Sequence, residues 1–483
     1  MLLATSQENL INFWESDAWG FITILSALLG SLILANILKK KIGFLAKSLI
    51  PTSVLGGLIL LIVSFVYTLI VGKNPDGTWE NIFNLDLFGG NGLRNLYVIT
   101  YHCLAIGFIA STFKPQKEKF NKKRTAEVFN TGVTTVASYL LQGVLGMGIT
   151  IGLALTVMPD LFKASGLILP FGYGQGTGQA LNWGSIWESR ETDPFVGGAN
   201  FGLTVAALGF LSASIGGVIH LNIMKKQGRL KVVEAGETQV DASQILAKDE
   251  TPFVESIDKM SIQLGFVLLA YVIAYALMWG ISELIGMTET IYGFNFLFGV
   301  LATVLIKNIL KGLKKCGAVK KEYVNGFLMD RICGFAFDLM IVAGFAAIEL
   351  QLLVDYWYIL LILGVVGGVS TYFYNAFVAK KLFPSYADEQ FLAMYGMLTG
   401  TASTGMMLLR EVDNGQSKSE ENLVYQNLPA IVFGFPIMIL AKIAPDQPVM
   451  VCLILLGLFV VMNVILFRRY IFFFIKRSKR KNK

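Results

Sequence analysis

Charged residues are scarce in this sequence. Only 15% of its 483 residues are Asp, Glu, Lys or Arg, whereas about a quarter of a soluble domain is charged. Histidine and cysteine are also rare, with 2 and 4 copies, and their spacing fits neither a zinc site nor a disulfide framework. These shortages count against an enzyme that relies on clustered acids, bases or thiols.

Apolar residues are abundant instead. They make up 54% of the chain and occur in long runs rather than at the spacing of an amphipathic helix. Because a helix needs about 20 apolar residues to cross the hydrocarbon core, the sequence predicts an all-α polytopic membrane protein. The first run, from Trp19, is preceded by neither a basic segment nor a cleavage site, so we expect a membrane span rather than a cleaved signal peptide.

Polar loops separate the predicted spans. The spans cover about 19–38, 50–72, 95–113, 129–157, 196–223, 260–286, 291–310, 331–351, 356–378, 424–442 and 447–467. Two further apolar stretches, 164–187 and 386–409, are interrupted near their middle by glycine, threonine and serine. These interruptions favour re-entrant hairpins, which enter the membrane and return on the same side.

The basic loops indicate the topology. The net charge of +7 comes from clusters near 39–47, 114–124, 225–231, 307–321, 380–381 and 468–483. If both interrupted stretches are re-entrant, every cluster lies on one side, which is the cytoplasmic side by the positive-inside rule. We therefore predict a multi-pass protein of the cell (plasma) membrane, with the N-terminus outside and the C-terminus in the cytoplasm. We interpret these basic clusters as markers of the membrane topology and not as a surface that binds nucleic acid.

The hairpins divide the chain into two halves. Residues 1–224 form a first five-span repeat with hairpin 164–187, and residues 260–443 form a second with hairpin 386–409. A cytoplasmic linker, 225–259, joins them, and residues 444–483 add an extra span and a basic tail. Because five is odd, the second repeat is inverted relative to the first, as in many secondary transporters, whose sites lie where broken helices meet near the midplane.

The glycine-rich hairpin tips are the predicted site. Non-helical backbone at membrane depth occurs only inside protein or beside water, and the helix start after each tip offers free N–H groups to a carboxylate. The candidate substrate-binding residues are Gln175, Gly176, Thr177, Gly178, Gln179, Thr399, Gly400, Thr401, Ser403 and Thr404. The candidate ligands of a coupling cation are Asn182, Asp338 and Thr401. Close helix packing is the alternative explanation of the glycines, and Asp338 can instead pair with Arg331.

Three segments resemble the sodium/glutamate symporter family. They are GYGQGTGQALNWG from Gly172, LTVAALGFLSASIGGVIHLNIMKK from Leu203 and GMLTGTASTG from Gly396. IPTSVLGGLI from Ile50 is similar to that family's second span, and the resemblance covers roughly 19–443. It implies inverted five-span repeats, sodium-driven glutamate uptake, homodimers and alternating access by a moving unit that contains the hairpins. Gln175 departs from the family's GGHGT-like core, which leaves strict glutamate specificity open.

These observations predict a secondary transporter and not an enzyme. The predicted activity is sodium-coupled symport of glutamate or a similar anionic amino acid, with sodium as coupling ion and no other cofactor. A proton- or sodium-coupled carrier of a dicarboxylate or 2-hydroxycarboxylate is the main alternative, followed by a channel or a membrane-embedded enzyme. The expected partners are the small anionic substrate, sodium, the lipid bilayer and a second copy of the chain, without nucleic acid.

Overall fold

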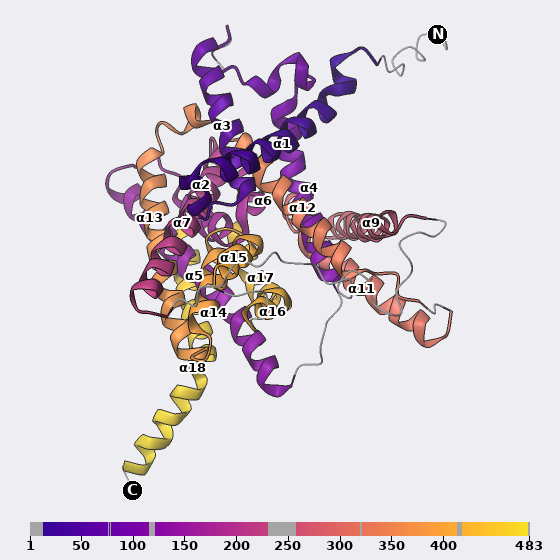
Figure 1. Cartoon of the computed structure of the whole chain (residues 1–483). Helices are drawn as coiled ribbons and strands as arrows, with labels where there is room; N and C mark the ends of the chain where they lie inside the picture. The colour runs from indigo at the N-terminus through magenta and orange to yellow at the C-terminus, as the bar shows by residue number, and fades with distance from the viewer. Residues whose placement is uncertain are drawn as a thin grey trace.

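The computed structural model describes residues 13–75, 77, 79–114, 121–229, 257–318, 321–412 and 418–481. Within these ranges the chain is helical, with no strand beyond a single bridge between Lys73 and Trp79. Most of the predicted linker, residues 230–256, lies outside the described residues, so the linker stays a prediction. Figure 1 shows the arrangement of the helices.

The helices follow the apolar runs of the sequence. They are α1 (Ser16–Lys41), α2 (Gly43–Lys47), α3 (Thr52–Val71), α4 (Gly92–Phe113), α5 (Lys122–Thr156), α6 (Ile168–Glu188), α7 (Gly198–Lys226), α9 (Lys259–Ile285), α10 (Thr288–Tyr292), α11 (Asn295–Lys315), α12 (Gly326–Ala346), α13 (Trp357–Leu382), α14 (Ala387–Leu398), α15 (Ala402–Arg410), α16 (Lys418–Tyr425), α17 (Asn427–Ile443) and α18 (Pro448–Lys481). Short 3-10 turns occur at Ile82–Asn84, Asp86–Phe88, Lys163–Leu167 and Leu350–Leu353.

Nine helices of the described residues are long and apolar enough to cross a membrane. They are α1, α3, α4 with the turn before it, α5, α7, α9, α11, α13 and the Pro448–Arg468 part of α18. This confirms the predicted class, an all-α multi-pass membrane protein. Two other predicted spans are less regular: 331–351 corresponds to α12, which ends at Ala346, and 424–442 corresponds to α17, which has 17 residues and an internal Pro436.

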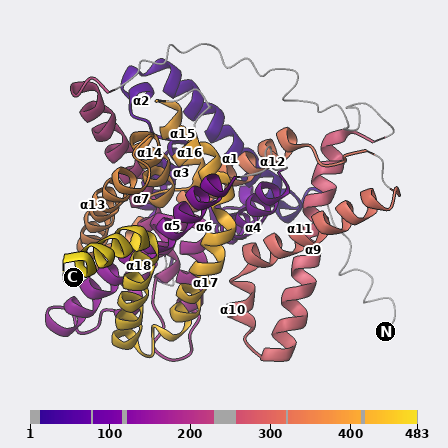
Figure 2. The same cartoon turned by 90° about the horizontal axis from the view of Figure 1, so that it is seen from below.

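Large apolar side chains on the outer helices face away from the protein. Leu34 on α1, Ile70 on α3 and Leu284 on α9 are exposed, as expected where lipid rather than protein covers a helix. Figure 2 shows α9, α10 and α11 along one side and α13 and α18 along the other, with α4, α5 and α6 between them. Of the three central helices α6 is the most fully buried, with 17 of its 21 residues buried.

The predicted extra span, α18, packs on α5 and α13. Tyr374 of α13 donates a hydrogen bond to the Asn463 side-chain oxygen at 3.0 Å, and the rings of Phe377 and Phe467 lie 5.5 Å apart. Beyond this contact α18 extends past the rest of the bundle, at the bottom of Figure 1. The extra span is thus an integral part of one side of the bundle.

Candidate functional site

The helix α6 folds back on itself at Gly176. This residue has φ 77° and ψ −168°, a conformation that is essentially restricted to glycine. The rings of Phe171 and Trp183, on either side of the break, stack with centroids 5.5 Å apart. In a straight helix the backbone of these two residues would be separated by roughly 18 Å. The ring of Phe162 likewise lies 5.7 Å from that of Trp187, so both ends of the segment lie together.

A second folded-back segment joins α14 and α15. The chain leaves helical geometry at Thr399 (φ −124°, ψ 7°) and returns after Thr401 (φ −139°, ψ 171°). The two helices then pack closely, because a Cβ placed on Gly396 would lie only 2.7 Å from the Gly405 Cα. Both interruptions predicted from the sequence are therefore real breaks in the helices.

The two breaks touch each other. A Cβ on Gly176 would lie 3.0 Å from the Thr401 Cγ2 and 3.6 Å from the Gly400 carbonyl oxygen. Gly209, near the centre of α7, lies against the second break, since a Cβ there would approach the Thr399 carbonyl oxygen to 2.7 Å. Segments far apart in the sequence thus form one small region of non-helical backbone beside the middle of α7.

The middle of α5 also holds both segments. The Tyr139 hydroxyl donates to the Gly174 carbonyl at 2.9 Å, just before the first break. The Gln142 amide donates to the Leu398 carbonyl at 3.0 Å, just before the second. Each bond satisfies a carbonyl that a continuous helix would have paired.

The two segments approach from opposite ends of α7. The Phe162 ring, before α6, stacks on Phe195 at 4.7 Å, immediately before the N-terminal end of α7. His220, near the C-terminal end of α7, lies 3.3 Å from the Asp388 carboxylate in the first turn of α14. Because α7 is one continuous helix, its two ends fix the open ends of the two segments on opposite sides of the molecule.

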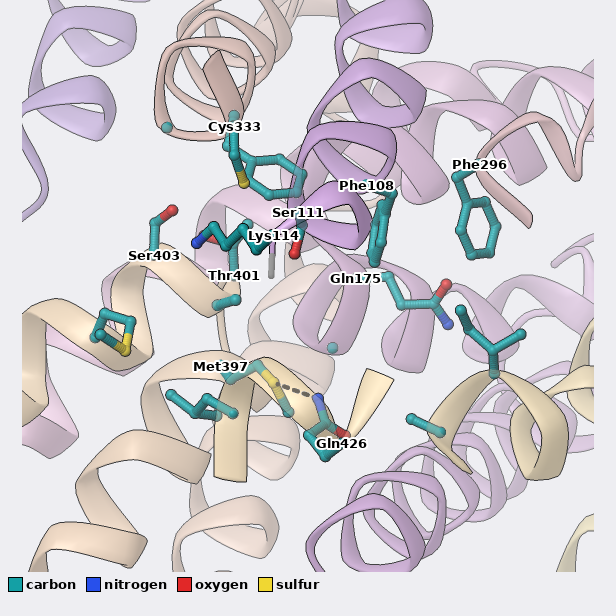
Figure 3. A pocket seen from close by; sticks show the side chains of 18 of the residues that line it. Phe108, Ser111, Lys114, Gln175, Phe296, Cys333, Met397, Thr401, Ser403 and Gln426 are labelled. Atoms are coloured by element: carbon teal, nitrogen blue, oxygen red, sulfur yellow. Dashed lines mark hydrogen bonds between the residues drawn. The ribbon is translucent and has the colours of Figure 1, made fainter. Parts of the chain in front are cut away.

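A cavity of about 550 Å³ lies beside the touching breaks. Among the predicted site residues, its lining includes Gln175, Thr401, Ser403 and Asp338. Figure 3 shows Thr401 and Ser403 on one side and Phe108 and Phe296 on the other. Other polar and charged lining residues are Ser111, Lys114, Tyr139, Asp330, Arg331, Glu420 and Gln426.

The cavity reaches solvent near the C-terminal end of α4. There Lys114 and Asp330 form an ion pair, and Arg331 lies 3.4 Å from the second oxygen of Asp330. The Asp330 and Arg331 side chains are 46% and 61% exposed. Since these residues line the cavity, its mouth lies at the end of the molecule where the predicted cytoplasmic loops begin.

The threonines behind the lining are hydrogen-bonded. The buried Thr177 hydroxyl donates to the Met340 carbonyl of α12 at 3.1 Å, and Thr399 donates to the Tyr395 carbonyl at 2.6 Å. Thr404 lies with its hydroxyl 3.4 Å from that of Thr401. These predicted residues therefore shape the breaks without lining the cavity.

The glycines at the breaks allow close packing. A Cβ on Gly178 would lie 2.9 Å from the Leu104 Cβ of α4, and one on Gly400 would lie 2.9 Å from the Thr404 hydroxyl. Close packing, the alternative explanation of the glycines, therefore accounts for Gly178 and Gly400, while Gly176 is needed for the break in the backbone.

The predicted cation ligands lie in different surroundings. Asp338 lines the cavity and lies near Ser53 of α3. Arg331, the alternative partner of Asp338, forms its ion pair with the neighbouring Asp330 instead. Asn182 lies away from the cavity lining and donates to the Gly293 carbonyl at 3.0 Å, which ties α6 to the segment before α11.

Two buried amides near the breaks have atoms without a partner. Gln179, 1% exposed, has neither its oxygen nor its nitrogen hydrogen-bonded within the part of the chain that is described, and the Gln142 side-chain oxygen is also unpaired there. Leaving a buried polar group unpaired costs about 1–3 kcal/mol, so such groups are expected where water or a ligand completes the hydrogen bonds. Their position, next to the breaks, marks this region as a candidate binding site.

The sequence analysis missed part of the lining. Gln426, between α16 and α17, accepts a hydrogen bond from Thr135 at 2.9 Å and lies 3.2 Å from the Met397 sulfur, the contact drawn as a dashed line in Figure 3. Its polar side chain at the start of a predicted span was a usable signal. The aromatic residues Phe108 and Phe296 gave no such signal, because phenylalanine is common in membrane spans.

No family model matches the chain, and no curated protein matches it.

Proposed function

We propose that this protein is an ion-coupled secondary transporter that binds the carboxylate of a small organic anion where the two breaks meet. The observation that carries the proposal is the contact of Gly176 with Thr401 and Gly400, beside the middle of helices that are long enough to span a membrane. In this proposal the two folded-back segments are re-entrant hairpins, one from each of two inverted repeats, residues 1–224 and 260–443. Hairpins that meet at mid-depth from opposite sides are the arrangement expected of such repeats.

The carboxylate site follows from the two helix starts. The helix α15 begins after Thr401, whose side chain makes no capping hydrogen bond, and the second limb of α6 begins after Gly176. The first N–H groups of a helix have no intrahelical partner and carry the positive end of its dipole. Two such starts in contact favour an anion between them, with Gln175 and Ser403 as further hydrogen-bonding groups from the cavity wall.

The coupling ion is proposed to be sodium. Hard cations prefer oxygen ligands, and Asp338, the Thr401 hydroxyl and the carbonyls of the broken backbone supply them. Asp338 suits this role because its carboxylate faces the cavity and no basic side chain forms a salt bridge with it among the described residues. A membrane potential then assists uptake by about 2.3 kcal/mol per charge for each 100 mV.

Alternating access requires that the cavity open to one side at a time. The mouth at Lys114 and Asp330 faces the side that we assign to the cytoplasm, so this arrangement corresponds to an inward-facing state. In the proposal the unit that contains the hairpins then moves relative to the helices on the α9–α11 side, within a homodimer in the cell membrane. The proposed orientation places the N-terminus outside and the C-terminus in the cytoplasm.

Labelled L-glutamate uptake into proteoliposomes, with and without an inward sodium gradient, tests the proposal, since the sequence resemblance makes this pair the first to try. Thr401→Val and Ser403→Ala alter the cavity wall, and Thr204→Val, on α7 and outside the lining, is the matched control. We expect the first two variants to weaken apparent affinity and the control to behave as the unmodified protein.

The alternatives give different results in the same vesicles. Accumulation driven by a proton gradient, with a dicarboxylate or 2-hydroxycarboxylate as substrate, favours the alternative carrier. Conductance without saturable uptake favours a channel, and turnover of an added substrate favours an enzyme. If Thr401→Val and Ser403→Ala had the same apparent substrate affinity as the control, the substrate would not bind at the two breaks.

A further inference from the structure

We infer that the transported substrate is an organic monocarboxylate with a bulky apolar body, such as an aryl group, rather than a dicarboxylate of the size of glutamate. This inference rests on the proposed function and specifies its substrate class. It follows from the walls of the cavity beyond the hairpin tips: their side chains, their charges and the volume that they enclose.

One wall of the cavity is aromatic. The ring of Phe108 on α4 lies 5.1 Å from that of Phe296 on α11 and 5.7 Å from that of Phe337 on α12. All three residues line the cavity, and Figure 3 shows Phe108 and Phe296 on the side away from Thr401 and Ser403. Aromatic rings prefer tilted or edge contacts with further rings, so this wall suits an apolar or aromatic group.

Methionine side chains complete the apolar surface. Met397, Met406, Met407 and Met438 line the cavity from α14, α15 and α17. Methionine is unbranched and polarisable, so it adapts to ligands of different shape and contacts aromatic rings favourably. A ligand whose carboxylate lies at Thr401 therefore has apolar side chains around the rest of its body.

The described lining holds more acidic than basic side chains, which disfavours a second carboxylate. Within the described lining the basic residues are Lys114 and Arg331, and both pair with Asp330 at the exposed mouth. Asp338 and Glu420 add further acidic groups. An ionised carboxylate that leaves water without a partner is strongly disfavoured. The hairpin tips can hold one carboxylate, and the described part of the lining offers no second group of helix starts for another.

The size of the cavity agrees with this substrate class. Its volume of about 550 Å³ lies within the range of roughly 300–1,000 Å³ that is typical of sites for drug-sized ligands. Glutamate carries a second carboxylate in place of an apolar group, so it has no group to place against the apolar wall. An arylalkyl carboxylate can place its carboxylate at the tips and its ring against Phe108 and Phe296.

The test uses the purified full-length protein and three probes in sodium buffer. They are 3-phenylpropionate, its neutral amide 3-phenylpropanamide and L-glutamate, with binding measured by equilibrium dialysis and transport measured in proteoliposomes. We expect 3-phenylpropionate to bind at least about tenfold more tightly than the other two, because they lack the carboxylate or the apolar body. Sodium-dependent accumulation of 3-phenylpropionate should follow.

Two phenylalanines of α17 provide a matched pair of variants. Phe435 lines the cavity, whereas Phe433 is absent from the lining and packs against Phe129 with ring centroids 5.8 Å apart. Phe435→Leu should weaken 3-phenylpropionate binding about tenfold, and Phe433→Leu should leave it unchanged. Elution volume and thermal unfolding in detergent verify that both variants fold.

The outcomes separate the inference from the function on which it rests. Tighter binding or faster uptake of glutamate than of 3-phenylpropionate overturns the inference and leaves the transporter standing. Equal effects of the two α17 variants also overturn it, since Phe435 would then serve packing alone. If neither carboxylate binds nor accumulates in folded protein, the proposed function fails as well.

Discussion

Replacement of Gly176 by alanine tests the contact between the two breaks most directly. At φ 77° and ψ −168°, a residue with a Cβ carries backbone strain of about 1–3 kcal/mol. The new Cβ would also lie 3.0 Å from the Thr401 Cγ2, whereas carbon atoms pack best at about 3.5–4.0 Å. The tips must therefore separate or distort. If this costs about 1–3 kcal/mol in the substrate-binding arrangement, Gly176→Ala should weaken apparent substrate affinity by roughly 5–150-fold.

The contact and the strain can be separated experimentally. Thr401→Ser removes the methyl group that meets the new Cβ, so Gly176→Ala/Thr401→Ser should recover part of the affinity that Gly176→Ala loses. The remaining loss measures the backbone strain. Gly148→Ala is the matched control, because Gly148 is helical and a Cβ there meets nothing within 4 Å.

The assays for these variants are substrate affinity by equilibrium dialysis and thermal unfolding in detergent. The control should be neutral or more stable by about 0.5–1 kcal/mol, since alanine is favoured over glycine inside a helix. If Gly176→Ala matched Gly148→Ala in affinity and in unfolding temperature, the reasoning about the tips would be refuted.

Three further predictions concern the same region. Asp338→Asn should raise the sodium concentration for half-maximal uptake by about tenfold or more, because a charged oxygen ligand is lost; an unchanged sodium dependence would exclude Asp338 from the ion site. Thr177→Val should lower the free energy of unfolding by about 1 kcal/mol through loss of its hydrogen bond to α12, whereas Thr177→Ser should not. In single-cysteine proteins, bound substrate should slow maleimide labelling of Cys333, which lines the cavity, but not of Cys103, which is equally buried elsewhere; protection of both or neither would contradict the placement of the site.

The positions of the helices were predictable because each depends on the hydrophobicity of its own stretch of sequence. The run predicted at 19–38 is α1 (Ser16–Lys41) and the one at 260–286 is α9 (Lys259–Ile285), with differences confined to the polar ends. The two interruptions were predictable for the same reason, since glycine, serine and threonine in an apolar run are visible locally. Which glycine turns the chain was not, because Gly172, Gly174 and Gly178 offer the same backbone freedom as Gly176.

Tertiary contacts decide what the local sequence leaves open. Gly172 lies against Val205 of α7 and Gly174 against Tyr139 of α5, so both stay within the first limb, and the chain turns only at Gly176. The cavity walls have the same origin: Phe108 and Phe296 come from helices that meet only in the folded protein. The alternative pairing of Asp338 with Arg331 was inferred along one helix, whereas Arg331 pairs with Asp330 and Asp338 lies near Ser53 of α3.

The packing of α18 constrains which part of the protein moves. Tyr374 and Phe377 join α18 to α13, and Cys452 of α18 lies against the Val144 carbonyl of α5. Since α5 also bonds to both folded-back segments, through Tyr139 and Gln142, relative movement of α18 and these segments would break the α5 packing on one side or the other. If the protein works as proposed, the extra span therefore moves with the folded-back segments. The proposed dimer contact is then expected on the opposite side of the bundle, where α9 exposes apolar side chains.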